Sequence, residues 1–407
     1  MSLTLSLILV VVFAFLVSRT LHRYAPQVLT LWSLEYLLVG VVAGPMALGL
    51  LGDTELEALQ PFLSLTLGLV GFALGLPLRR RVGRIRHFIF ALLAAVATIA
   101  FTAWAMRPVL AWLAPEVRGD AQLWLSLALG AAAACCSSQM IDSARSSFEA
   151  RGPTTNLLRS FAVASNVTAV CVAGLGLALA RAQNGSGRFG LSEPAWLLGS
   201  AGLGLALGVL FWLFVGDEGE EHQERTFLAT VGVVVFASGL ASAIGISPLF
   251  LNVLAGIVVS LLPRTERLHV AVTRLEKPAL IIVLIFAGAQ LRLHFSLLLI
   301  VPAIYAMLRY VALRASTATF SRVVPQVVAV PRFGDGVVAQ GAIAAAIAVN
   351  FAQVNPELTE VVLPVVLLGL VLSDISSIDG LRRLLSDAGE VGHAEPAAAW
   401  VVEEAGE

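Results

Sequence analysis

A short polar segment interrupts an apolar stretch of the chain that runs from about residue 121 to 141. Polar groups at the middle of such a stretch are costly in lipid unless they line a cavity or a solute path. Hydroxyl, amide and thiol groups in that position are suited to coordinate a hydrated monovalent cation or a small neutral solute. The segment consists of Cys135, Cys136, Ser137, Ser138 and Gln139.

Two further polar pairs lie inside other apolar stretches. They are Ser165 with Asn166, and Gln340 with Gly341. The carbonyl oxygen of an amide can coordinate a cation, but an amide does not titrate near neutral pH. We therefore predict an ion or solute path lined by Cys136, Ser137, Ser138, Gln139, Ser165, Asn166, Gln340 and Gly341, and Asn166 itself cannot exchange a proton.

Proton coupling requires a carboxylate, and the sequence offers two candidates. Glu35 lies about 10 Å into a predicted span that starts near residue 28. It is interpreted either as a functional residue or as a structural one that pairs or reaches the interface. Asp142 precedes Arg145 by three residues, a helical spacing that favours a salt bridge between them. Asp374 and Asp379 are expected at the cytoplasmic interface, close to the end of the last span.

The composition predicts a membrane protein throughout. Hydrophobic residues make up 58% of the chain, charged residues 13%, and the net charge is -1. Soluble domains carry about 25% charged residues, and a nucleic-acid partner would require a basic surface that this chain lacks. Histidines without metal-ligand spacing and the absence of nucleotide or hydrolase motifs predict no metal, no cofactor, no catalytic residue and therefore no enzyme.

Apolar stretches of spanning length predict an all-α polytopic membrane protein with about thirteen transmembrane helices. Arginines concentrate in alternate connections, which places the N-terminus outside and the C-terminus in the cytoplasm. We predict one transporter domain over residues 1–386 and a disordered cytoplasmic tail over 387–407. The predicted spans are 2–18, 28–51, 59–77, 88–112, 121–141, 157–181, 191–215, 226–245, 247–262, 275–291, 295–313, 336–352 and 361–380.

The two halves of the chain repeat each other. Residues 36–44 are echoed by 252–260, and residues 72–79 by 286–292, at an offset of about 210 residues. The polar break at 135–139 is echoed in the same way by Gln340 and Gly341. An extra helix at 191–215 links the repeats, about 1–181 and 226–380, and therefore inverts the second one. Inverted repeats with broken, crossing helices are typical of secondary transporters.

From about residue 28 to 380 the chain resembles the monovalent cation:proton antiporter superfamily, the Kef-like and sodium/proton exchanger group. The resemblance implies the sodium/proton antiporter fold, a homodimer, and monovalent cations and protons as the transported partners in the lipid bilayer. It also implies that Arg309 can partner an acid of the core, and we place Arg309 near the cytoplasmic end of its span. The matching segments are Gly40–Pro45, Leu127–Gly130, Gly245–Pro248, Val253–Gly256 and Leu284–Gly288.

The chain departs from the family at two places that carry its chemistry. The family's break carries a proline, and Cys136, Ser137 and Ser138 stand there instead. The family's acidic residue in the next span is replaced by Asn166. Any proton coupling must then use Glu35, Asp142 or another acid.

Three hypotheses follow from these observations, and the third is a passive channel. The first is a secondary-active transporter that moves a small monovalent cation or solute by alternating access. The second is a transport-inactive membrane sensor or accessory protein derived from an antiporter, which the loss of the acid and the proline favours. The scarcity of lysine and abundance of alanine indicate a GC-rich bacterial genome, and hence a bacterial plasma membrane.

Overall fold

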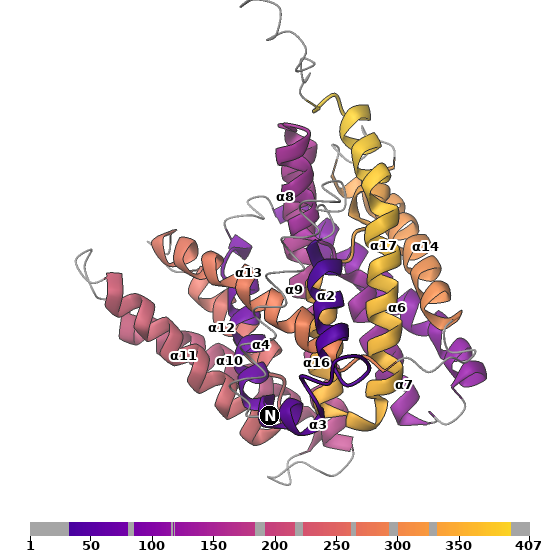
Figure 1. Cartoon of the computed structure of the whole chain (residues 1–407). Helices are drawn as coiled ribbons and strands as arrows, with labels where there is room; N and C mark the ends of the chain where they lie inside the picture. Colours follow the sequence, from indigo (N-terminus) through magenta and orange to yellow (C-terminus); the bar gives the residue numbers. More distant parts are fainter. Residues whose placement is uncertain are drawn as a thin grey trace, which may run out of the picture.

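The structure, a computed structural model, describes residues 32–79, 85–114, 117, 119–183, 192–215, 223–261, 266–292, 300–324 and 332–391. The first predicted span, 2–18, lies outside these residues. Every regular element in the described part of the chain is helical, which confirms the predicted all-α class (Figure 1). The α-helices are α2 (Trp32–Ala43), α3 (Asp53–Ala58), α4 (Gln60–Gly75), α6 (Ile85–Leu113), α7 (Asp120–Ala134), α8 (Ser138–Ser147), α9 (Pro153–Gln183), α10 (Glu193–Val215), α11 (Gln223–Ile244), α12 (Pro248–Ser260), α13 (Glu266–Ala289), α14 (Ile300–Phe320), α16 (Ala342–Val354) and α17 (Thr359–Asp387).

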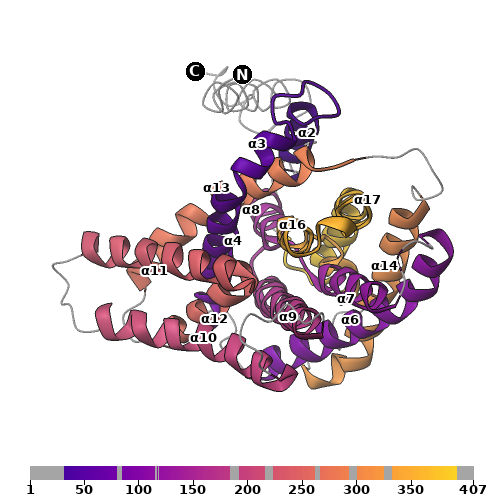
Figure 2. The same ribbon diagram turned by 90° about the horizontal axis from the view of Figure 1, so that it is seen from below.

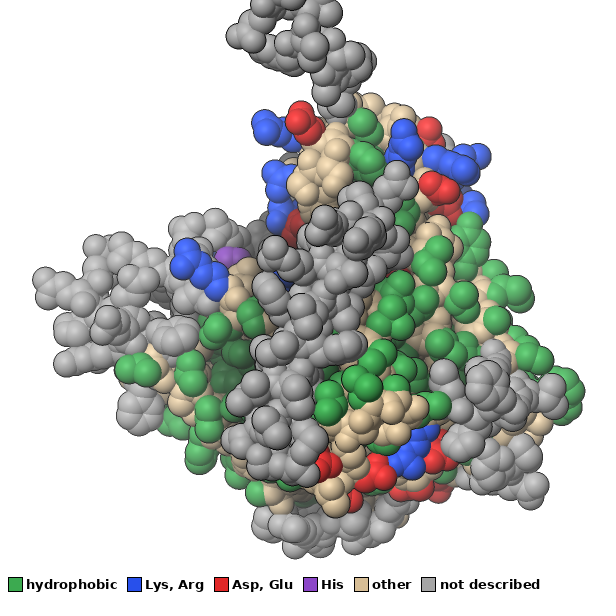
Figure 3. Space-filling model, viewed as in Figure 1, with side chains coloured by type: hydrophobic (Ala, Val, Ile, Leu, Met, Phe, Trp, Pro, Cys, Tyr) green, Lys and Arg blue, Asp and Glu red, His purple; other side chains and the backbone are tan. Residues whose placement is uncertain are grey.

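The surface has the character of a membrane protein. Hydrophobic side chains form a band across the middle of the molecule, and charged ones gather toward its two ends (Figure 3). Large apolar side chains point outward, with Trp104 72% and Trp112 77% exposed. Five stretches of the described chain are long and apolar enough to cross a bilayer, and α2, α4, α12 and α16 are shorter apolar helices.

The helices form two groups (Figure 2). We call α4, α10, α11, α12, α13 and the adjoining α2 the α4 bundle. The other group, α6 to α9 with α14, α16 and α17, is called the crossing bundle because its broken helices cross inside it. Within it, α17 runs almost the height of the molecule (Figure 1).

Glycines bring two helix pairs of the α4 bundle into backbone contact. A Cβ atom on Gly256 of α12 would lie 2.5 Å from the carbonyl oxygen of Phe72 on α4. Gly40 of α2 similarly meets the carbonyl of Ile285 on α13. The predicted repeat relates α2 to α12 and α4 to α13, so these two contacts are equivalent. Small residues of this kind allow close helix packing in a membrane, where burial of apolar surface supplies little driving force.

The start of the predicted disordered tail is folded. Glu390 is buried and accepts hydrogen bonds from the backbone N–H groups of Thr154 (2.6 Å) and Thr155 (2.8 Å) at the start of α9. Burial raises the pKa of the Glu390 carboxyl, but hydrogen bonds from Thr155 and Thr154 lower it by more, so the pKa lies below its ordinary value. The prediction of disorder from residue 387 is therefore wrong as far as residue 391.

The glycine contact between α4 and α12 can be tested with one methyl group. We expect Gly256→Ala to cost about 1–3 kcal/mol of stability, because the added Cβ pushes α12 away from Phe72. Gly232→Ala is the matched control, since a Cβ there meets nothing within 4 Å and alanine favours a helix by roughly 1 kcal/mol. Thermal unfolding in detergent, followed by tryptophan fluorescence, compares the two, and an equal effect would contradict this account of the packing.

Candidate functional site at the helix crossing

The first break separates α7 from α8 without a proline. α7 ends at Ala134, and Cys135 is extended (φ −66°, ψ 142°). The hydroxyl of Ser137 accepts a hydrogen bond from the N–H of Met140 (3.1 Å) and caps the start of α8. A serine cap favours a helix start, so the sequence Cys-Cys-Ser ends one helix and begins the next.

The second break lies between the 3₁₀ helix η4 (Phe333–Val337) and α16. The N–H of Ser137 donates to the carbonyl of Ala339 (2.8 Å), so the two breaks meet directly. Gly341 has a φ of +75°, and a Cβ on it would lie 2.8 Å from the Cβ of Ser137. Glycine is required here by both its conformation and its close approach. The structure thus brings 135–137 and Gln340–Gly341 together, as the repeat predicts.

Arg309 joins the two breaks. It is fully buried in the middle of α14, and its guanidinium donates to the carbonyl of Cys135 (2.7 Å) and to the carbonyl of Val338. The prediction that Arg309 lies near the cytoplasmic end of its span is therefore wrong. The carbonyl end of α7 carries partial negative charge, so a cation is attracted to the point where the helix stops.

Asn166 and Ser165 hold the first break from the neighbouring helix α9. The side-chain oxygen of Asn166 accepts from the N–H of Cys136 (2.8 Å), and its side-chain nitrogen donates to the carbonyl of Cys136 (2.9 Å). The hydroxyl of Ser165 donates to the carbonyl of Ala134 (2.6 Å). These bonds satisfy backbone groups that the helix break leaves unpaired. Asn166 thus clamps the backbone, and its amide oxygen already has a donor.

Gln340 retains one free acceptor. Its side-chain amide donates to the carbonyl of Ala132 (2.9 Å) and to the hydroxyl of Tyr305 (2.7 Å). Its Oε1 atom is buried and has no hydrogen-bond partner among the described residues. A buried acceptor without a donor is costly, which makes this oxygen a candidate to accept from a water or to contact a cation.

Asp374 is a candidate functional residue that lies away from the interface where we expected it. It is 3% exposed, accepts from the hydroxyl of Ser33 (2.7 Å) and the N–H of Gln340 (2.9 Å), and attracts Arg309 electrostatically. The expected interfacial position is wrong because α17 continues to Asp387, about 20 Å beyond Asp374. Leu381, Leu384 and Leu385 continue the apolar face of this helix past residue 380 and are the signal that could have shown it.

The two carboxylates proposed from the sequence lie elsewhere. Asp142 on α8 pairs with Arg159 (2.7 Å) instead of Arg145, and its side chain is 41% exposed. Glu35 on α2 is half-buried, and its Oε1 atom is buried without a hydrogen-bond partner in the described chain. Ser138 and Gln139 are half-buried in the first turn of α8 and make none of the hydrogen bonds described above.

Cys135, Cys136 and Cys171 are free thiols, the first two buried within the crossing. In the residues that the structure covers, no group of three His, Cys, Asp or Glu side chains is placed to hold a metal ion.

The arrangement of the helices matches a solved structure. The sodium proton antiporter MjNhaP1 from Methanocaldococcus jannaschii, determined at pH 8, aligns with a TM-score of 0.67 over 95% of this chain and 100% of its own. This chain has the fold of a sodium/proton antiporter. Because the sequence identity is 16%, the likeness concerns the fold alone. No protein-family model matches the sequence, and no curated protein does.

The electrostatic link between Arg309 and Asp374 can be measured by a double-mutant cycle. We expect Arg309→Met to cost about 3–5 kcal/mol, because it leaves Asp374 and two carbonyls without their cation. Adding Asp374→Asn removes the uncompensated charge, so the double variant should lose less than the sum of the single losses. Arg322→Met, at an exposed arginine, is the control. Additive losses in thermal unfolding would show that the two charges are not coupled.

Proposed function

We propose that this protein is a secondary-active transporter that exchanges a small monovalent cation for protons by alternating access. The observation that carries this proposal is the crossing itself, where Arg309 connects two broken helices beside the buried carboxylate of Asp374. Broken helices in inverted repeats present carbonyl oxygens and helix ends near the bilayer midplane, where transported ions bind.

Asp374 is our candidate for the proton-coupling residue. Arg309, Asp374 and Glu390 are the buried charged residues of the described chain, and Glu390 lies away from the crossing at the start of α9. A cation that enters the crossing competes with Arg309 for the carbonyls of Cys135 and Val338 and for the charge of Asp374. Protonation of Asp374 removes that charge, so proton and cation binding oppose each other. Glu35 is the second candidate, and Asp142 the third.

Contacts between the bundles support alternating access. Ser33 on α2 hydrogen-bonds Asp374 on α17 (2.7 Å). Toward the opposite end, Gln353 on α16 donates to Gln60 on α4 (2.7 Å). Rocking one bundle against the other must break such contacts in turn. We further propose that the chain is a homodimer in a bacterial plasma membrane, with the N-terminus outside and the C-terminus in the cytoplasm.

A specific observation also favours the second hypothesis, a transport-inactive sensor or accessory protein. The side-chain oxygen and nitrogen of Asn166 are both already hydrogen-bonded to the backbone of Cys136. The guanidinium of Arg309 donates to carbonyls that could otherwise ligate a cation. In that hypothesis Arg309 acts as a permanently tethered cation, and the crossing is a fixed structural junction.

Transport assays in proteoliposomes separate the two functions. Under an imposed pH gradient, we expect sodium, potassium or lithium to collapse the gradient, as read by a pH-sensitive dye. Asp374→Asn should abolish this response, because an amide cannot carry the proton, whereas Asp379→Asn on the exposed part of the same helix should retain it. Asn166→Asp adds the acid that the resembling family has and should preserve or increase exchange.

The antiporter proposal fails if neither the wild-type protein nor Asn166→Asp moves any of the three ions or dissipates the gradient. A stoichiometric protein partner that co-purifies with a flux-inactive chain would then establish the accessory function.

A further inference from the structure

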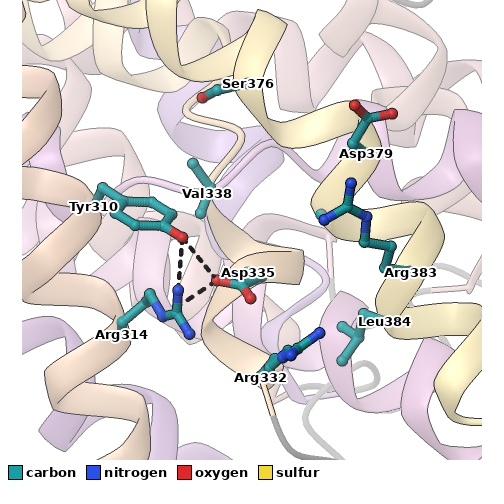
Figure 4. Close-up of a pocket in the computed structure, with 10 residues that line it drawn as sticks. Tyr310, Arg314, Arg332, Asp335, Val338, Ser376, Asp379, Arg383 and Leu384 are labelled. Atoms are coloured by element: carbon teal, nitrogen blue, oxygen red, sulfur yellow. Dashed lines mark hydrogen bonds and ion pairs between the residues drawn. The ribbon is translucent and has the colours of Figure 1, made fainter.

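A second polar cavity lies outside the crossing, at the end of the molecule where α17 finishes (Figure 4). Its volume is about 420 Å³, and its walls come from α14, η4 and α17. Ligand pockets typically measure about 300–1,000 Å³, so this cavity is large enough for a small molecule. Three arginines line it: Arg314 from α14, Arg332 next to η4, and Arg383 from α17.

One of the three arginines is neutralised within the cavity. Arg314 lies 3.3 Å from the carboxylate of Asp335 and donates to the hydroxyl of Tyr310 (2.7 Å). Tyr310 in turn donates to Asp335 (3.3 Å), which closes a triangle of contacts along one wall (Figure 4). These contacts hold the side chains of this wall in place.

Among the described residues, the other two arginines have no such partner. No carboxylate of the described residues lies within ion-pairing distance of Arg332 or Arg383, although Asp379 also lines the cavity. Three arginines face two aspartates, so the cavity has an excess of positive charge. In Figure 4, Arg383 lies across the cavity from Arg314, and Arg332 lies below Asp335.

We propose that this cavity binds a phosphate-bearing anion. Guanidinium groups recognise phosphate oxygens through paired, charge-assisted hydrogen bonds, and Arg332 and Arg383 supply two such groups from different elements. The ring of Tyr310 and the side chains of Val338 and Leu384 supply apolar surface for the remainder of a small phosphorylated molecule. An anionic lipid headgroup presents the same chemistry, so the test must distinguish the two sources.

The cavity is connected to the crossing. Val338 lines the cavity, and its carbonyl accepts the hydrogen bond from Arg309. Arg383 lies on α17, the helix that carries Asp374. An anion held by Arg332 and Arg383 ties η4 to α17 and so restrains the two segments that place Val338 and Asp374 around Arg309. The binding itself does not depend on the proposed transport activity.

Thermal unfolding of the full chain in detergent tests the binding. We expect inorganic phosphate or AMP to raise the midpoint of unfolding saturably, by about 2 °C or more, relative to sodium chloride at equal ionic strength. The double variant R332N/R383Q should lose this shift. Asparagine is chosen at position 332 because the backbone there has a φ of +73°, which asparagine tolerates. Arg322→Gln, at an exposed arginine outside the cavity, should keep the shift.

The same measurement in bilayer nanodiscs identifies the source of the phosphate. Stabilisation by phosphatidylglycerol over phosphatidylcholine that R332N/R383Q abolishes, with no response to inorganic phosphate or AMP, assigns the cavity to a lipid headgroup. Arg383→Gln alone serves if the double variant does not fold. The proposal is overturned if no probe shifts the midpoint, or if the double variant responds as strongly as Arg322→Gln. Neither result bears on cation exchange, which the proteoliposome assay measures separately.

Discussion

The structure depends on one buried cation. Arg309 lies fully inside a membrane-protein fold, where an unpaired charge costs several kcal/mol or more. It is tolerated because two carbonyls at helix breaks accept its hydrogen bonds and the nearby carboxyl of Asp374 attracts it electrostatically. The breaks in turn need Arg309, since their carbonyls have left the helical hydrogen-bond pattern. The crossing and the burial of Asp374 are therefore parts of a single electrostatic arrangement, and the absence of a side chain at Gly341 lets the two breaks approach closely.

This arrangement explains how the chain keeps an antiporter fold with unusual residues at its centre. The break between α7 and α8 needs no proline, because Ser137 caps the new helix and Asn166 binds both backbone groups of Cys136. An aspartate at position 166 could accept from the N–H of Cys136, but it could not donate to the carbonyl. The amide thus suits a structural clamp, and the buried carboxyl group of the crossing comes from Asp374 on α17 instead of from α9.

The sequence predicted the location of the crossing well and its charges poorly. Polar residues inside apolar runs, repeated in both halves of the chain, indicated that 135–139 and Gln340–Gly341 would meet. The depth of an ionisable residue is harder to predict, because it depends on where a helix ends. Asp374 was assigned to an interface because the last span was predicted to end at residue 380, yet the helix continues to Asp387. Helical spacing likewise suggested Arg145 as the partner of Asp142, but α9 presents Arg159 from another part of the chain.

The central claim is that a cation and a proton compete at the crossing through Asp374. It is tested most directly by adding sodium, potassium or lithium salts to the purified protein in weakly buffered detergent solution and recording the pH with a dye. The account predicts proton release from the wild-type protein and from Glu35→Gln, and none from Asp374→Asn. Undiminished proton release from a folded Asp374→Asn protein would contradict it.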